Sequence, residues 1–141
     1  MDQPLHKIIG GAHRTKVAVY GYGMMLKRES VEDHVARFKD EAAAIISMGF
    51  KAAKMKTGLG PKNDVKLCEA VAQGVGSAPF MVDANHCYTT PDAFYVGRAL
   101  DEMEAYWFEE PVAPEDHDGY RELRAGLRTN ISGGEAEYNR W

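Results

Sequence analysis

Short apolar runs alternate with longer segments in which apolar residues recur at helical spacing. The short runs contain β-branched and aromatic residues and end at glycine, proline or charged positions, as strands do. They predict strands at residues 17–20, 50–56, 79–82, 106–108 and 131–132. The longer segments predict helices at residues 31–48, 64–75, 90–103 and 118–127.

Local signals support the helix boundaries. Ser30 is a typical N-cap residue, and the acidic residues that follow it suit the positive end of the helix dipole. Gly49 is the expected end of that helix. Thr90 followed by Pro91 predicts a cap and a first-turn proline for the third helix.

Five strands that alternate with four helices predict a parallel sheet. Two architectures fit this order. One is an open, doubly wound domain, which 141 residues could complete. The other is part of a (β/α)8 barrel, which normally needs about 250 residues. In both architectures, functional residues gather at the C-terminal ends of the strands.

Charged and polar side chains lie at the C-terminal ends of four of the predicted strands. Because side chains alternate along a strand, the two lysines of the second strand share a face, as do the acid and amide after the third. The acids of successive strands are 26 residues apart, which indicates a common level. These residues are Lys54, Lys56, Asp83, Asn85, Glu109 and Glu135.

Three neighbouring carboxylates repel one another unless a cation neutralises them. A set of oxygen ligands favours a hard cation, and we expect Mg²⁺ at Asp83, Glu109 and Glu135. The alternative is that each acid is a solvated loop residue that begins a helix.

The paired lysines suggest acid–base chemistry. Two ammonium groups on one face are expected to lower each other's pKa, which would make Lys54 or Lys56 a usable base near neutral pH. Lysine together with Mg²⁺ can remove a proton next to a carboxylate, as in enolase-type sites. The alternative is one snorkelling lysine and one surface salt bridge.

The doublet Glu109-Glu110 divides between two directions, because adjacent strand residues face opposite sides. We expect Glu109 to point to the interior and Glu110 to the helix layer or rim, where water or a cation can reach it. On this interpretation, only Glu109 takes part in the chemistry.

The ordered motifs KMK, MVDAN, WFEEP and SGGE resemble the barrel domain of the enolase superfamily, specifically its mandelate racemase and muconate-lactonizing branch. The resemblance implies that Lys56 is the base and that Lys54 tunes it and contacts the substrate carboxylate. It implies Mg²⁺ ligands at Asp83, Glu109 and Glu135, with Asn85 at the edge between metal and substrate. His86 follows Asn85 and is a further candidate for substrate contact.

The resemblance also implies that the chain is a fragment: a partial TIM-type barrel with about the first five strands and four helices. Residues 1–14 would be the tail of a capping domain, and residues 15–141 the N-terminal part of the catalytic barrel. The rest of the capping domain and three C-terminal strands would be missing, so we expect the fragment alone to be inactive.

The substrate expected from the resemblance is a small carboxylate. DANHCY and WFEEPVAPEDHDGY look most like sugar-acid dehydratases or galactarolactone-type cycloisomerases. Racemisation or epimerisation stays open, because the residues that discriminate these outcomes lie outside the chain. The parent enzyme is expected to be a homo-oligomer.

The composition restricts the classes of molecule that the protein is expected to bind. The net charge is −4 and no cluster of basic residues forms, which argues against nucleic acid and anionic membranes. The absence of a signal-peptide pattern predicts a cytoplasmic protein. Two rival hypotheses remain: an Mg²⁺-dependent phosphoryl-transfer domain, and a non-catalytic binding module whose acids merely cap helices.

Overall fold

The computed structural model describes residues 2–138, so Met1 and residues 139–141 of the predicted domains lie outside the described residues. The helices are α1 (Leu5–Ile8), α2 (Val31–Ser47), α3 (Pro61–Val75), α4 (Thr90–Glu102) and α5 (His117–Gly126). The strands are β1 (Gly21–Tyr22), β2 (Ala53–Lys56), β3 (Phe80–Asp83), β4 (Trp107–Glu109) and β5 (Asn130–Ser132).

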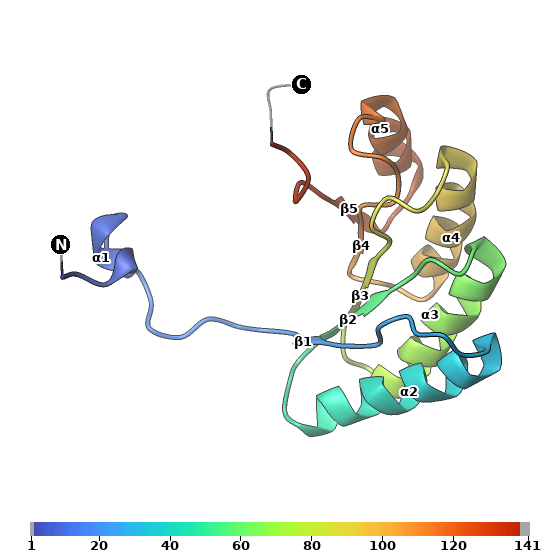
Figure 1. Ribbon diagram of the computed structural model, residues 1–141, viewed down its shortest axis with the longest axis horizontal. Helices are drawn as coiled ribbons and strands as arrows, with labels where there is room; N and C mark the ends of the chain where they lie inside the picture. Colours follow the sequence, from blue (N-terminus) through green and yellow to red (C-terminus); the bar gives the residue numbers. More distant parts are fainter. Residues whose placement is uncertain (1, 139–141) are drawn as a thin grey trace.

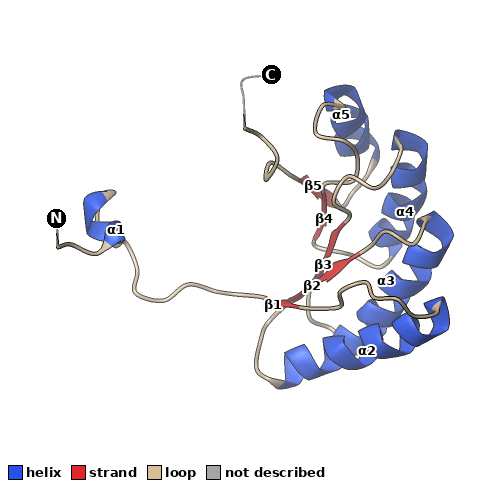
Figure 2. Cartoon of the chain, in the orientation of Figure 1, coloured by secondary structure: helices blue, strands red, loops and turns tan. Residues whose placement is uncertain are grey.

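The strands form one parallel sheet in the order β1-β2-β3-β4-β5 (Figure 1). Helices α2 to α5 all lie on one side of it (Figure 2). A doubly wound domain reverses its strand order and covers both faces of the sheet, whereas a barrel adds each βα unit in sequence with its helices outside. The fold is therefore part of a barrel, and the open architecture was the wrong alternative.

The hydrophobic core lies between the sheet and the helices. Alternate strand residues enter it, including Ala53 and Met55 of β2, Val82 of β3 and Phe108 of β4. Their neighbours along the strands point to the opposite face, which none of the helices in the described part of the chain covers (Figure 2). Alternation thus separates an apolar side of the sheet from the side that carries the lysines and acids.

Helix capping follows the sequence signals closely. The Ser30 hydroxyl accepts a hydrogen bond from the backbone N–H of Asp33, as predicted. The third predicted helix is instead capped by Thr89, one residue before the expected cap. Helix α3 begins at Pro61 and not near Asp64, because a proline in the first turn needs no hydrogen-bond acceptor.

The first strand was predicted wrongly. Residues 17–20 are extended but unpaired, and β1 consists of Gly21 and Tyr22, paired with Ala53 and Lys54. An added Cβ at Gly21 would lie 2.2 Å from the side chain of Ile45 in α2, so the glycine permits close packing of strand and helix. The β-prone residues 17–20 precede the two residues that lie opposite β2, so they do not pair with that strand.

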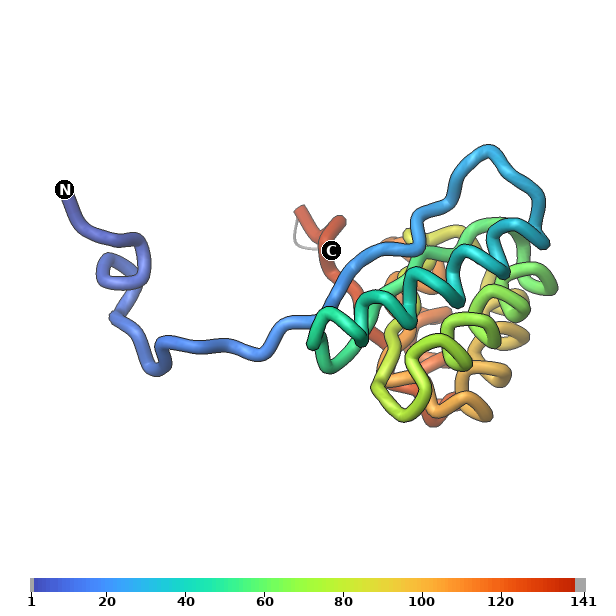
Figure 3. The backbone as a smooth tube through the Cα atoms, turned by 90° about the horizontal axis from the view of Figure 1, so that it is seen from below, coloured from blue at the N-terminus to red at the C-terminus, as the bar shows by residue number. Residues whose placement is uncertain are grey.

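The N-terminal segment lies apart from the sheet and helices in two perpendicular views (Figure 1, Figure 3). Helix α1 contains no buried residue. The domain boundary after residue 14 stays a prediction. None of the helices described between residues 2 and 138 combines the length and apolar character that a membrane span requires.

Gly74 offers a test of the packing between α2 and α3. A Cβ at this position would lie 2.3 Å from the backbone carbonyl oxygen of Lys39, which cannot rotate away. We expect Gly74→Ala to lower the free energy of unfolding by about 1–3 kcal/mol, because overpacking outweighs the better helix propensity of alanine. Urea unfolding followed by circular dichroism measures the change.

The matched control is Lys66→Ala on the exposed face of the same helix. Its free energy of unfolding should stay within about 0.5 kcal/mol of that of the unsubstituted chain. A Gly74→Ala variant as stable as this control would show that α2 and α3 do not approach as closely as described.

Candidate active site

Strand register brings the predicted residues to one edge of the sheet. Lys56 pairs with Asp83, and Asp83 pairs with Glu109, so these three lie at the same level on adjacent strands. The residue at that level on β5 is Ser132. Glu135 is exposed and lies in the turn three residues beyond it.

Both lysines contact carboxylates. Lys54 Nζ lies 3.0 and 2.9 Å from the two Glu109 carboxylate oxygens and 3.3 Å from Asp83 Oδ2. Lys56 Nζ lies 2.7 Å from the same Asp83 oxygen. Asp83 is 1% exposed, so the two ammonium groups supply the neutralisation that its buried charge requires.

The pKa values of the lysines move in the direction opposite to the prediction. Burial lowers the pKa of Lys54, but the hydrogen bonds and charges of Glu109 and Asp83 outweigh it and raise the pKa above its ordinary value. For Lys56, burial is likewise outweighed by Asp83. The charge of Lys54 does lower the pKa of Lys56, but it is the weakest of these influences.

The same contacts lower the pKa of Asp83. Burial raises it, and the hydrogen bonds and charges of Lys56 and Lys54 more than reverse that effect. The ion pairs therefore stabilise the fold fully at pH values above 3.8, the unperturbed pKa of the carboxyl group. This contribution is lost as the pH falls through the lowered pKa of Asp83.

Asn85 connects the inner acids to the outer one. Its side-chain oxygen accepts a hydrogen bond from Lys56, and its side-chain nitrogen donates to Glu135 Oε1 at 3.3 Å. The backbone N–H of Asn85 donates to Asp83 Oδ1 at 3.2 Å. Lys56, Asp83, Asn85 and Glu135 thus form one chain of contacts across the end of the sheet.

The donor set fits a hard cation at its two inner members. A single cationic group, the Lys54 ammonium, already lies within 3.3 Å of both Asp83 and Glu109. Within residues 2–138, however, no three side chains among His, Cys, Asp and Glu converge as a metal site. The full ligand set of Asp83, Glu109 and Glu135 stays a prediction.

Aromatic rings around the lysines were missed from the sequence. Lys54 Nζ lies 5.7 and 5.6 Å from the ring centres of Tyr20 and Tyr22, and Trp107 Nε1 donates to Glu109 Oε2 at 3.0 Å. Cations are attracted to such ring faces. The two-residue spacing of the tyrosines, which gives them the same face as the lysines, was the available signal.

The segment after β3 continues alongside β4. The backbone N–H groups of Ala84, His86 and Tyr88 donate to the carbonyl oxygens of Glu109, Glu110 and Pro111 at 2.9, 2.7 and 3.2 Å. Every second residue of the segment after β3 therefore pairs with successive residues from Glu109 to Pro111. This pairing holds the loop with Asn85 and His86 against the end of β4.

A buried hydrogen bond fixes the far end of that loop. The Tyr88 hydroxyl donates to Asp64 Oδ2 at 2.7 Å, and Asp64 Oδ1 accepts from the backbone N–H groups of Gly58 and Leu59. Burial and the charge of Asp64 raise the pKa of Tyr88, so the hydroxyl keeps its proton. Asp64 therefore ties the loop after β2 to the loop after β3.

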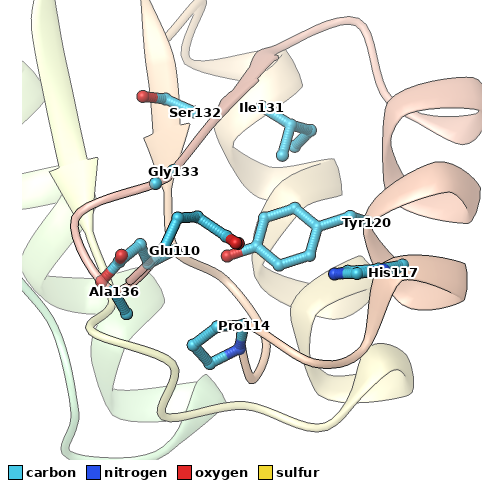
Figure 4. A pocket seen from close by; sticks show the side chains of 10 residues that line it. Glu110, Pro114, His117, Tyr120, Ile131, Ser132, Gly133 and Ala136 are labelled. Atoms are coloured by element: carbon cyan, nitrogen blue, oxygen red, sulfur yellow. The ribbon is translucent and has the colours of Figure 1, made fainter. Parts of the chain in front are cut away.

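Glu110 faces the helix side, as predicted, and at 2% exposed it is more buried than a residue at the rim would be. It lines a cavity of about 300 Å³ beside α5 and points toward Tyr120 (Figure 4). Burial, aided by the charges of Glu110 and Glu137, raises the pKa of Tyr120 to about 12. His86 Nδ1 lies 3.3 Å from Glu110 Oε2.

Comparison with known proteins identifies the family of the fold. A family model described as "Enolase C-terminal domain-like" matches residues 37–141. The chain belongs to this family. The acids and lysines at the sheet edge therefore lie in a fold whose known members include sugar-acid enzymes and racemases, as the following relatives show.

D-galactarolactone cycloisomerase of Agrobacterium fabrum is 37% identical over 135 residues, which cover 95% of this chain and 35% of that enzyme. Arabinonate dehydratase of Saccharolobus solfataricus is 32% identical, with 99% of this chain and 37% of the enzyme covered. A racemase from Streptomyces coelicolor with bound magnesium is 36% identical, with a TM-score of 0.73 over 84% of this chain and 32% of that one. The chain spans about a third of the length of these relatives.

Removal of Lys54 tests its role between the two acids. We expect Lys54→Met to lower the free energy of unfolding at neutral pH by about 2–4 kcal/mol, because Asp83 and Glu109 lose a shared cation at a largely buried position. Urea unfolding measures the change. The loss should shrink on acidification, when protonation removes the carboxylate charges.

Magnesium chloride should stabilise Lys54→Met more than the unsubstituted chain, because the vacated position between two carboxylates favours a cation that binds the folded state. Sodium chloride at equal ionic strength is the control for screening. Equal responses to the two salts in the variant would contradict a cation site at these acids.

Proposed function

We propose that the chain forms the proton-abstracting half of a barrel enzyme that acts next to the carboxylate of a sugar acid or sugar lactone. The observation that carries the proposal is the contact of Lys54 and Lys56 with Asp83 and Glu109 at the C-terminal edge of a sequentially ordered parallel sheet. The curated relatives named above support the substrate class, and the magnesium-bound racemase supports the metal.

In this proposal, Lys56 accepts the proton α to the substrate carboxylate, and Lys54 lies beside it to contact that carboxylate. Asp83 and Glu109, with Glu135, would hold magnesium, which when bound stabilises the negative charge that develops on the carboxylate. Asp83 now raises the pKa of Lys56. The amine can therefore act as a base near neutral pH only when another cation neutralises Asp83.

Residues of the chain also shape the surroundings of the reacting carbon. Asn85 accepts from Lys56 and donates to Glu135, so its amide lies where a substrate oxygen would approach the acids. The rings of Tyr20 and Tyr22 lie beside the ammonium groups of Lys54 and Lys56 and limit their movement toward β1. These contacts favour one position for Lys56 relative to a substrate bound over the sheet edge.

The outcome after proton removal is proposed as elimination of water or opening of a lactone, matching the dehydratases and cycloisomerases among the relatives. Both reactions share the first step, and they differ in the leaving group: a hydroxyl that is protonated and leaves as water in the dehydration, and the ring carboxylate in the opening of the lactone. Racemisation is the third outcome that this first step permits.

Exchange of the substrate α-proton tests the assignment of Lys56. In the complete barrel protein, Lys56→Ala should slow exchange of that proton in D₂O by about 10²–10⁴-fold, the usual contribution of a general base. Proton NMR of galactarate measures the exchange. Calorimetric titration with Mg²⁺ should show that the metal still binds.

The matched control is Lys62→Ala, which removes an exposed lysine from the first turn of α3 and should leave exchange unchanged. Exchange that survives in Lys56→Ala would assign the base to another residue. Absence of exchange in the unsubstituted protein, with or without Mg²⁺, would contradict the proposed reaction itself.

A further inference from the structure

Three residues beside the proposed site share an unusual backbone conformation. Asn85, His86 and Glu110 have φ angles of 42°, 57° and 44°, in the left-handed region that side-chain-bearing residues rarely adopt. Such angles cost energy and persist where the surrounding structure holds them, often at functional positions. Here the loop of Asn85 and His86 lies directly against the end of β4.

Two contacts join His86 to Glu110. The backbone N–H of His86 donates to the Glu110 carbonyl oxygen at 2.7 Å, and the ring Nδ1 lies 3.3 Å from Glu110 Oε2. The exposures differ sharply, since the His86 side chain is 37% exposed and the Glu110 side chain is 2% exposed. The partly exposed imidazole thus contacts a carboxylate that is itself buried.

The buried oxygen of Glu110 needs a partner. Glu110 Oε2 makes no hydrogen bond within the described part of the chain, although a buried carboxylate is costly to leave uncompensated. Tyr120, which lines the same cavity, directs its hydroxyl to the carbonyl oxygen of Val112 at 3.3 Å. The His86 ring nitrogen, 3.3 Å away, lacks hydrogen-bond geometry as it stands but is close enough to donate to this oxygen after a small rotation of the ring.

We propose that Glu110 is a positioning residue for His86. It accepts from Nδ1–H, fixes the ring tautomer and directs the unprotonated Nε2 to a hydroxyl group of the sugar-acid substrate. A carboxylate that orients an imidazole in this way is a common device where the second ring nitrogen has a task. Glu109, the last residue of β4, and Glu110, the residue directly after it, then both serve the site.

The tautomer of His86 tests the pair without requiring any activity. In the ¹⁵N-labelled 141-residue chain, two-bond ¹H–¹⁵N spectra at a pH where the ring is neutral should show Nδ1 protonated and Nε2 unprotonated. Glu110→Leu should invert this preference, because free imidazole side chains favour Nε2–H. Glu110→Gln keeps the shape and one oxygen acceptor and should lie between the two.

Two controls accompany this measurement. Glu104→Leu replaces an exposed glutamate whose backbone is also left-handed, φ 54°, and should leave the His86 signals unchanged. The ring of His34, which is buried and bonded to the Ser30 carbonyl oxygen at 2.8 Å, reports that each variant is folded. An Nε2–H tautomer in the unsubstituted chain, or no change in either Glu110 variant, would overturn the proposal.

Substrate kinetics in the complete barrel protein provide the second test, which rests on the proposed function. His86→Gln and Glu110→Gln should each raise KM for galactarate about tenfold, the effect of one substrate hydrogen bond, with kcat within about twofold. The double variant should be no worse than His86→Gln, because the two residues act as one unit.

Additive losses in the double variant would overturn the positioning role. If the unsubstituted protein does not process galactarate or a related sugar acid, the proposed function fails, and the tautomer measurement still decides whether Glu110 orients His86.

Discussion

Neutralisation of Asp83 is the interaction on which the end of this sheet depends. The carboxylate is almost completely buried at the last residue of β3, and two lysines from the neighbouring strand reach it. The acids opposite stabilise each lysine at its partly buried position, and the two lysines neutralise the buried acid. The charged side chains of β2, β3 and β4 therefore depend on one another. In the proposed chemistry, a metal cation takes over from the lysines the neutralisation of the acids.

Strand alternation distributes this chemistry over two faces. On the open face lie the lysines, Asp83, Glu109 and the aromatic rings, all of which can approach a small molecule. On the helix side lies Glu110, whose carboxylate contacts the partly exposed imidazole of His86. The backbone of the loop after β3 pairs with residues 109–111, and this pairing holds His86 beside Glu110.

Much of the fold could be predicted because its signals are local. Capping residues and apolar spacing gave four helices, and β-prone runs with an acid at the end gave β3 and β4. The first strand was misplaced because pairing with β2, and not the residue types at 17–20, decides where β1 lies. The strand order that selects a barrel depends on all five strands together, so periodicity alone left two architectures open.

The candidate site, like the fold, could be predicted only in part. Alternation was enough to place Lys54 and Lys56 on one face and Asp83 beside Glu109. The pKa direction was predicted wrongly because only the repulsion within β2 is visible in the sequence, whereas the stronger attraction comes from β3 and β4. The pairing of His86 with Glu110 could not be predicted either, because it depends on left-handed backbone angles in a loop.

Those left-handed angles also limit how the site can change during evolution. A β-branched residue is strongly disfavoured at φ near +50°, so valine, isoleucine and threonine are poor replacements at positions 85, 86 and 110. Replacements that keep the loop in place are drawn from glycine, asparagine, aspartate and other unbranched side chains. Backbone geometry thus disfavours β-branched side chains at this corner of the barrel, whatever substrate a related protein takes.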